Sequence, residues 1–198
     1  MSTFVIDAGI RDNYTRGVVA DFLRDNIKGG SNLSVVSAYF TIYAYEALKD
    51  WLEDIEHMDF LFGEPRFVRA LDPNKTEKKA FIIDGSDLRL ANVLQQKRIA
   101  RECADWIRAK VSIKSVKQVN FLHGKMYHTA TDGVEHAILG SSNFTTRGLG
   151  LSAGDSNIEL NLIVDSDRDR ADLKAWFDGL WNDEKLVEDV KGEVLQYL

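Results

Sequence analysis

The chain has 198 residues, of which 44% are hydrophobic and 28% charged, and its formal net charge is −6. This length fits one globular domain with a buried core. No apolar run is long enough to cross a bilayer, and the first residues lack the charged-then-apolar pattern of a signal peptide. The lone cysteine, Cys103, excludes a disulfide framework and a cysteine-based metal cluster. We therefore expect a single cytoplasmic domain over residues 1–198, without a cofactor, a metal or a membrane partner.

Helical and strand periodicity alternate along the chain. A first helix is expected from Asp12, as its N-cap, to about Asn26, where Gly29-Gly30 breaks the pattern. The next strand, helix and strand predict a parallel pair with a crossover. The fold class that this order predicts is α/β, with a mixed central β-sheet flanked by helices. In chain order, the remaining expected elements are a strand over 33–39, a helix over 43–55, a strand over 58–63, a loop or added element over 64–90, a helix over 91–110, strands over 119–128, 136–140 and 157–164, and helices over 169–180 and 184–198.

The net negative charge is unevenly distributed. From Arg66 to Lys125 the chain has 14 basic and 6 acidic residues, so this segment carries +8 and leaves −14 for the remainder. A basic stretch of this kind is what a phosphodiester-binding surface needs. The alternative is that these charges form the solvated face of the helix expected around residues 91–110.

His123 and Lys125 are the first candidate site residues. The pattern from Val119 to His128 predicts a strand, in which residues two apart point to the same face. A histidine can supply a nucleophilic nitrogen, and a lysine can supply a fixed positive charge beside it. Phosphoryl transfer needs both, because negative charge spreads over the phosphate oxygens during the attack.

Small polar residues follow the next expected strand. Residues 131–133, Thr-Asp-Gly, are a turn signal, so the strands on either side form a hairpin. The hairpin places Ser141 and Asn143 at the end of the strand beside His123, where their side chains could hydrogen-bond the site. Glu159 lies on the following strand, and a carboxylate beside a histidine can fix its tautomer and stabilise the imidazolium form.

At these positions the chain resembles the phospholipase D superfamily. The motif of that family is His-x-Lys, four residues, Asp, then Gly-Ser-x-Asn and a downstream Glu or Asn. His123, Lys125, residues 140–143 (Gly-Ser-Ser-Asn) and Glu159 match it in type and order. The motif aspartate does not match, because Ala130 stands at its position. The same stretches are similar to phospholipase D-like domains at the N-termini of some bacterial helicases, and to single-motif nucleases and restriction endonucleases.

The resemblance implies a specific mechanism. One histidine attacks phosphorus to form a phosphohistidine, a second histidine protonates the leaving group, and water resolves the intermediate without a metal. His123 would be the nucleophile or, in the partner half, the acid. Lys125 and Asn143 would hold the phosphate oxygens, with Ser141 supporting them. Glu159 would orient the histidine, and Ser142 and Arg147 would bind the substrate. Because the chain has one His-x-Lys, we expect a homodimer in which each copy gives one histidine. DNA is the expected substrate.

Two other functions fit the same residues. The chain could be a non-catalytic nucleic-acid-binding or interaction module, excised from a longer chain with a C-terminal helicase or restriction domain; Ala130 in place of the aspartate favours this hypothesis. It predicts DNA binding without cleavage. The second alternative is a phosphatidyl-transferring lipid enzyme, against which the lack of a basic amphipathic helix counts.

Overall fold

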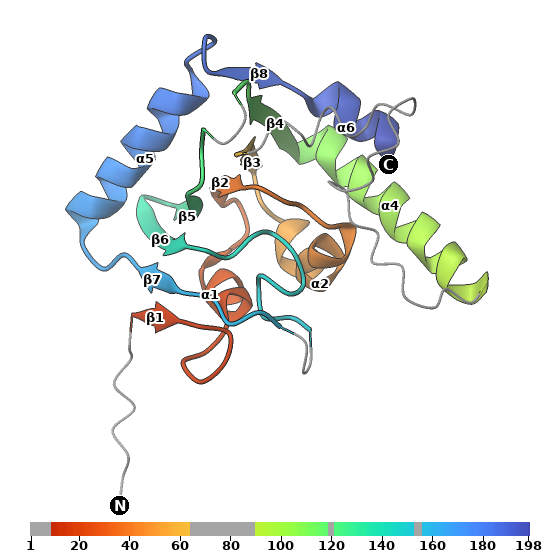
Figure 1. Cartoon of the computed structure of the whole chain (residues 1–198), viewed down its shortest axis with the longest axis horizontal. Helices are drawn as coiled ribbons and strands as arrows, with labels where there is room; N and C mark the ends of the chain where they lie inside the picture. Colours follow the sequence, from red (N-terminus) through yellow and green to blue (C-terminus); the bar gives the residue numbers. More distant parts are fainter. Residues whose placement is uncertain (1–8, 64–89, 119–120, 153–155) are drawn as a thin grey trace, which may run out of the picture.

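A computed structural model describes residues 9–63, 90–118, 121–152 and 156–198. Its centre is an eight-stranded mixed sheet of strand order β1-β7-β6-β5-β2-β3-β4-β8 (Figure 1). The strands are β1 (Ile10–Arg11), β2 (Asn32–Ser37), β3 (His57–Phe62), β4 (Val111–Val116), β5 (Lys125–Thr131), β6 (Val134–Gly140), β7 (Asn161–Ile163) and β8 (Val187–Asp189). The helices are α1 (Val19–Asn26), α2 (Ile42–Leu52), α4 (Leu90–Lys110), α5 (Asp167–Trp181) and α6 (Lys191–Tyr197).

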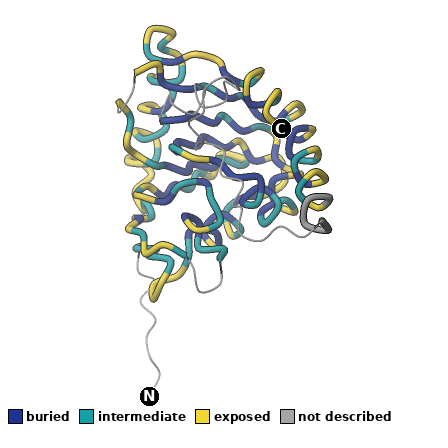
Figure 2. Tube along the Cα trace, turned by 45° about the vertical axis from the view of Figure 1, so that its right-hand side comes forward, coloured by how far each residue is buried: buried dark blue, intermediate teal, exposed yellow. Residues whose placement is uncertain are grey.

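The sheet separates two apolar clusters. Strands β2, β3 and β4 are parallel, β5 pairs with β2 antiparallel, and β6, β7 and β1 lie beyond β5. The strands in the middle of the sheet are mostly buried (Figure 2). Buried side chains of α1, α2, α4 and α6 pack together over one face in the larger cluster, which includes Leu48 and Trp106. Helix α5 packs over the other face through Phe177, against Val36 and Leu61 of the sheet. The predicted class, α/β with a mixed sheet flanked by helices, is confirmed.

Two predicted helices were wrong in part, and one strand of the buried middle was not predicted. Helix α1 begins at Val19 rather than Asp12, because the Asp12 carboxylate accepts the N–H groups of Tyr14, Thr15 and Arg16 and closes a loop of its own. The expected helix over 184–198 is instead strand β8 followed by the short helix α6. Strand β4 was not predicted, although its register with β3 completes the parallel middle of the sheet.

Residues 64–89, where a loop or added element was expected, lie outside the described residues. Within the described ranges, none of the helices is both long and apolar enough to cross a membrane.

Candidate active site

The motif residues meet at one edge of the sheet because of strand direction. Strand β5 is antiparallel to β2, so the first residue of β5 lies near the carboxyl end of β2. The end of β6 returns to the same edge, where Gly140 pairs with Lys125. Asn143 is tied to the end of β2: its Oδ1 accepts from the Ala38 N–H at 3.0 Å and from Ser37 Oγ at 3.2 Å. These contacts occupy the amide oxygen, and among the residues that the structure describes no hydrogen bond is made by Asn143 Nδ2, which can therefore donate to a ligand.

His123 lies on a loop, not on the strand that the sequence predicted. Strand β5 begins at Lys125, and residues 121–124 precede it as an irregular segment with His123 exposed. The loop crosses the end of β3 so closely that a Cβ on Gly63 would lie 2.5 Å from the Leu122 carbonyl oxygen. The side chain of Leu122 packs into the α5-side cluster and anchors the loop. Lys125 Nζ donates to the His123 carbonyl oxygen at 2.9 Å, so the two motif residues are joined through the backbone.

Ser141 and Glu159 form the second part of the site. The Ser141 hydroxyl donates to the Glu159 carboxylate and accepts from the Leu160 N–H at 3.0 Å. Asn157 Nδ2 donates to the other oxygen of Glu159 at 3.3 Å. Among the described residues, no hydrogen bond joins Glu159 to His123, so the carboxylate is held by the Gly-Ser-Ser-Asn segment.

Ser142 is fully buried, and each of its polar groups has a protein partner. Its carbonyl accepts from the Tyr127 hydroxyl at 2.9 Å, and its N–H and hydroxyl bond the amide of Asn161 at 3.2 and 2.9 Å. Asn161 Nδ2 also donates to the Arg11 carbonyl at 3.0 Å. Asn161 therefore fixes the backbone of the Gly-Ser-Ser-Asn loop at residues 140–143. Sequence reasoning missed this role, although the alternation Asn157-x-Glu159-x-Asn161 was a possible signal.

Arg147 lies in the loop after Asn143 and is exposed. Four of the six described basic residues of α4 and β4 have local partners, namely Arg98, Arg108, Lys110 and Lys114. Arg98 pairs with Glu46 and Glu102, and Lys110 donates to backbone carbonyls of residues 53 and 55. For this part of the basic segment, the interpretation as a helix face with its own ion pairs fits the structure.

The other histidines lie away from the motif loop in the fold. His128 is fully buried on the α5 side, its nearest carboxylate oxygen being Glu135 Oε2 at 3.7 Å, and burial lowers its pKa. Burial also lowers the pKa of His136 on β6. His57 begins β3, where its Nε2 lies 3.2 Å from Asp59 Oδ1 and 3.1 Å from Ser112 Oγ. Within the described ranges, no group of three or more His, Cys, Asp or Glu side chains is close enough to hold a metal ion.

A family model described as "Cardiolipin synthase, PLD-like domain" matches residues 64–181, which is more than half of the chain and includes the whole motif region. The chain belongs to this phospholipase D-like family. The family match and the sheet-edge site agree with the resemblance seen in the sequence.

Two solved structures have a fold similar to that of this chain. Polyphosphate kinase from Porphyromonas gingivalis is 9% identical with a TM-score of 0.52, over 89% of this chain and 21% of that chain. Phosphatidylserine synthase from Haemophilus influenzae Rd KW20 is 12% identical with a TM-score of 0.50, over 91% of this chain and 38% of that chain. The chain therefore spans about a fifth and about two fifths of these proteins. Among curated proteins, no match was found.

Proposed function

We propose that this phospholipase D-like domain is a phosphodiesterase that cleaves DNA through a phosphohistidine, with a homodimer completing the site. The observation that carries the proposal is the convergence of the His123 loop, Lys125 and the Asn143 loop at one edge of the sheet. A nucleophile, a cation and an amide donor at one edge are what a phosphoryl group needs in the transition state.

In the proposed reaction, a ring nitrogen of His123 attacks phosphorus and the bond from phosphorus to the leaving oxygen breaks. The leaving oxygen takes its proton from a second histidine, which the partner copy supplies. Water then attacks the phosphohistidine, gives its proton to that second histidine, and releases a phosphomonoester. Lys125 and Asn143 hold the phosphate oxygens, while Glu159 acts through Ser141 to keep the motif loop in place.

The replacement of the motif aspartate by Ala130 does not remove a group from this edge. Ala130 lies five residues beyond Lys125 on the same strand, where it pairs with Asn32 and Glu135. At about 3.3 Å per residue, that position is roughly 17 Å away, at the opposite end of β5. A carboxylate there would not reach a phosphate held by Lys125. The substitution is therefore compatible with activity.

Phosphatidyl transfer is the second candidate function. It is supported by the description of the matching family model and by the likeness to a phosphatidylserine synthase. The same histidine chemistry would serve it, with an alcohol in place of water as the acceptor.

Labelled single- and double-stranded DNA and phospholipid vesicles, each in excess EDTA, test the proposal. We expect the wild-type protein to cleave DNA and the His123→Ala variant to bind DNA without cleaving it. A His57→Ala variant is the matched control, because His57 lies at the start of β3, whereas the His123 loop crosses the other end of β3 at Gly63. Lipid turnover without DNA cleavage would replace the nuclease proposal with phosphatidyl transfer. Salt-sensitive DNA binding without any cleavage would indicate a binding module instead.

A further inference from the structure

The edge of the sheet at which the motif residues meet, here called the motif edge, continues beyond them to β1. Lys125 on β5 pairs with Gly140 on β6, which pairs with Asn161 on β7. Asn161 in turn pairs with Arg11 on β1. Neighbouring strands lie about 4.8 Å apart, so Arg11 is roughly 14 Å from Lys125 along this edge. A stacked single strand of DNA advances about 3.4 Å per nucleotide, so the distance corresponds to about four nucleotides.

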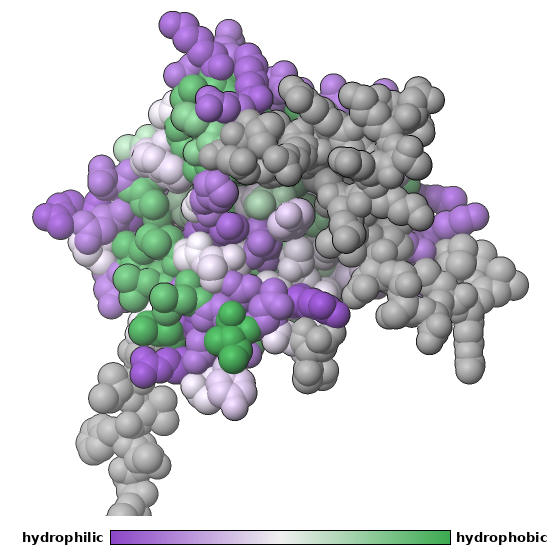
Figure 3. Space-filling model, in the orientation of Figure 1, coloured by the Kyte–Doolittle hydropathy of each residue, from purple (hydrophilic) through white to green (hydrophobic). Residues whose placement is uncertain are grey.

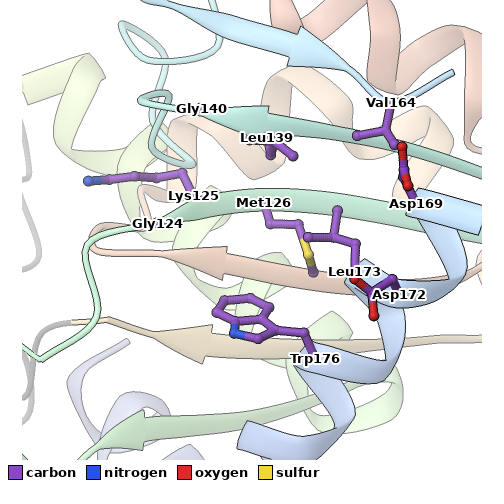
Figure 4. A pocket seen from close by; sticks show the side chains of 10 residues that line it. All are labelled: Gly124, Lys125, Met126, Leu139, Gly140, Val164, Asp169, Asp172, Leu173 and Trp176. Carbon is purple, nitrogen blue, oxygen red and sulfur yellow. The ribbon is translucent and has the colours of Figure 1, made fainter. Parts of the chain in front are cut away.

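Lys125 directs its charge to the motif edge and not toward α5. The residue borders a cavity of about 380 Å³ beside α5. Its side chain, however, extends away from the α5 residues Leu173 and Trp176 (Figure 4). Its Nζ donates to the His123 carbonyl oxygen in the loop before β5. A phosphate held by Lys125 would therefore lie off the ends of the strands, and the chain beyond that phosphate could run along the motif edge.

The β1–α1 loop, residues 12–17, lies against the segments on either side of β7 and β6 at this edge (Figure 1). The Asp12 carbonyl oxygen accepts from the Glu159 N–H at 3.0 Å. Asn13 Nδ2 donates to the Gly148 carbonyl oxygen at 2.7 Å, in the loop that follows the Gly-Ser-Ser-Asn segment. The β1–α1 loop is therefore attached directly to both segments that carry the second part of the candidate site.

The shape of the β1–α1 loop is fixed by its own hydrogen bonds. The Asp12 carboxylate accepts the N–H groups of residues 14–16 at 2.8 to 2.9 Å. These bonds, that of Arg16 first, lower the pKa of Asp12 to about 2. The Asn13 N–H donates to the Gly17 carbonyl oxygen at 3.0 Å, and both residues have positive φ. Because the loop already has one defined shape, binding a ligand there orders little additional chain.

Two side chains at the tip of the loop are open to solvent. Tyr14 is 75% exposed, more than any other large hydrophobic side chain in the described ranges. Arg16 is also exposed, and among the described residues its guanidinium has no hydrogen bond or ion pair. At the lower left of Figure 3, over β1 and β7, hydrophobic residues lie among hydrophilic ones. An aromatic ring beside a cation is the combination that binds the bases and phosphates of a single strand.

The charges around the loop also favour an anion. Arg11 at the end of β1 and Arg147 in the loop after β6 bring two further cations to this part of the motif edge. Two carboxylates, those of Asp12 and Glu159, lie beside them, and both accept hydrogen bonds from the protein. Three arginines against two carboxylates leave this group positive, although the whole chain carries −6.

We propose that Tyr14 and Arg16 form a subsite for single-stranded DNA, in which the Tyr14 ring stacks on a base about four nucleotides from the scissile phosphate and Arg16 pairs with a neighbouring phosphate. The inference rests on the proposed function, because Lys125 must hold the scissile phosphate. The faces of bases inside a duplex are already stacked on each other, so this subsite selects single strands.

Fluorescence anisotropy with a labelled oligothymidylate long enough to reach from Lys125 to Tyr14, and with the duplex of the same length, tests the stacking. All variants are made in the His123→Ala background, so that cleavage does not interfere. We expect Tyr14→Ala to weaken single-strand binding about 5- to 140-fold and to leave duplex binding unchanged. Tyr14→Phe keeps the ring and should bind normally, as should Tyr197→Ala, the control on α6, where Tyr197 is 42% exposed. Unchanged single-strand binding by Tyr14→Ala, or an equal loss on the duplex, would overturn the subsite.

The salt dependence of the same binding tests Arg16. For Arg16→Ala we expect the slope of log affinity against log salt to become shallower by about 0.7, the effect of losing one phosphate contact on a single strand. Arg168→Ala is the matched control, since Arg168 lies in the first turn of α5, beyond the far end of β7, and should leave the slope unchanged. An unchanged slope in Arg16→Ala would contradict the phosphate contact.

These measurements separate the subsite from the proposed reaction. Single-strand binding with both expected dependences, but no cleavage by the protein with His123 intact, would refute the proposed reaction alone. Cleavage of single-stranded DNA with unchanged affinity in Tyr14→Ala and Arg16→Ala would refute the subsite alone. Weaker binding of these two variants to anionic phospholipid vesicles, with unchanged DNA affinity, would assign the loop to a lipid surface and overturn the inference.

Discussion

Replacing Gly140 by alanine tests whether the two motif segments are as tightly joined as the structure indicates. A Cβ on Gly140 would lie 2.2 Å from the Leu160 carbonyl oxygen and 2.6 Å from the Asn161 Cα. Both are backbone atoms that cannot turn aside, so the end of β6 must move from the β7 side by more than 1 Å to reach ordinary contact. The movement would disturb the hydrogen bonds of the next residue, Ser141, whose hydroxyl donates to Glu159 and accepts from the Leu160 N–H.

The expected cost follows from two opposing effects. Overpacking of this kind costs about 1–3 kcal/mol, and the loss of glycine freedom in the unfolded chain returns about 0.4–1 kcal/mol. We expect a net loss of about 1–2 kcal/mol in the free energy of unfolding, which lowers the Tm by about 2–8 °C for a chain of this size. Cleavage should fall as well, because Ser141 and Glu159 are displaced.

Gly124 provides the matched control within the same motif region. A Cβ there meets nothing within 4 Å, and the backbone has no positive φ. Gly124→Ala should therefore leave the Tm unchanged or raise it slightly. Calorimetry of the two variants beside wild type decides the question, and equal Tm values for Gly140→Ala and Gly124→Ala would refute the close approach of β6 to the residues before β7.

Three further predictions concern residues inside the fold. Asn161→Ala leaves buried partners of the motif loop without hydrogen bonds, so urea unfolding should show a loss of about 2–4 kcal/mol, with Asn157→Ala as the exposed control. Ala130→Asp should leave the cleavage rate unchanged and cost about 0.2–1 kcal/mol, because it faces Glu135 across the strands; a faster enzyme would contradict the distance between Ala130 and the site. Because burial lowers the pKa of His128, the unfolded chain binds a proton that the folded chain does not, so the free energy of unfolding should fall as the pH drops below about 6.5. His128→Gln should remove part of this fall in the free energy of unfolding, while His136, whose pKa burial also lowers, contributes the remainder. An unchanged pH dependence in His128→Gln would contradict the lowered pKa of His128.

Local periodicity was enough to predict most of the middle of the sheet. The strand over 33–39 was recognisable as a short buried run after the Gly29-Gly30 break, and β2 confirms it. The helix expected over 91–110 is confirmed by α4. The hairpin over β5 and β6 was recognisable from its Asp-Gly turn, in which Asp132 and Gly133 both have positive φ. These signals lie within a few residues of one another and do not depend on the rest of the chain.

The parts that could not be predicted depend on contacts between distant residues. Residues 119–124 have the alternation of a strand, yet the described part of the segment becomes a loop where Leu122 meets Gly63, 59 positions earlier in the chain. Val187 becomes part of a strand because it pairs with Val116. The role of Asn161 was hidden for the same reason, since its partners are Ser142 and Arg11.

The loop position of His123 also sets it apart from the other motif residues. Asn143, Ser141 and Glu159 are fixed by hydrogen bonds to neighbouring strands, whereas the His123 loop is held through Leu122 in the cluster under α5. Leu122 and Trp176 share the wall of a cavity of about 240 Å³, so α5 also lies beside the segment that carries His123. The packing of Leu122 under α5 therefore fixes the proposed nucleophile against phosphate-binding groups that the sheet already holds in place.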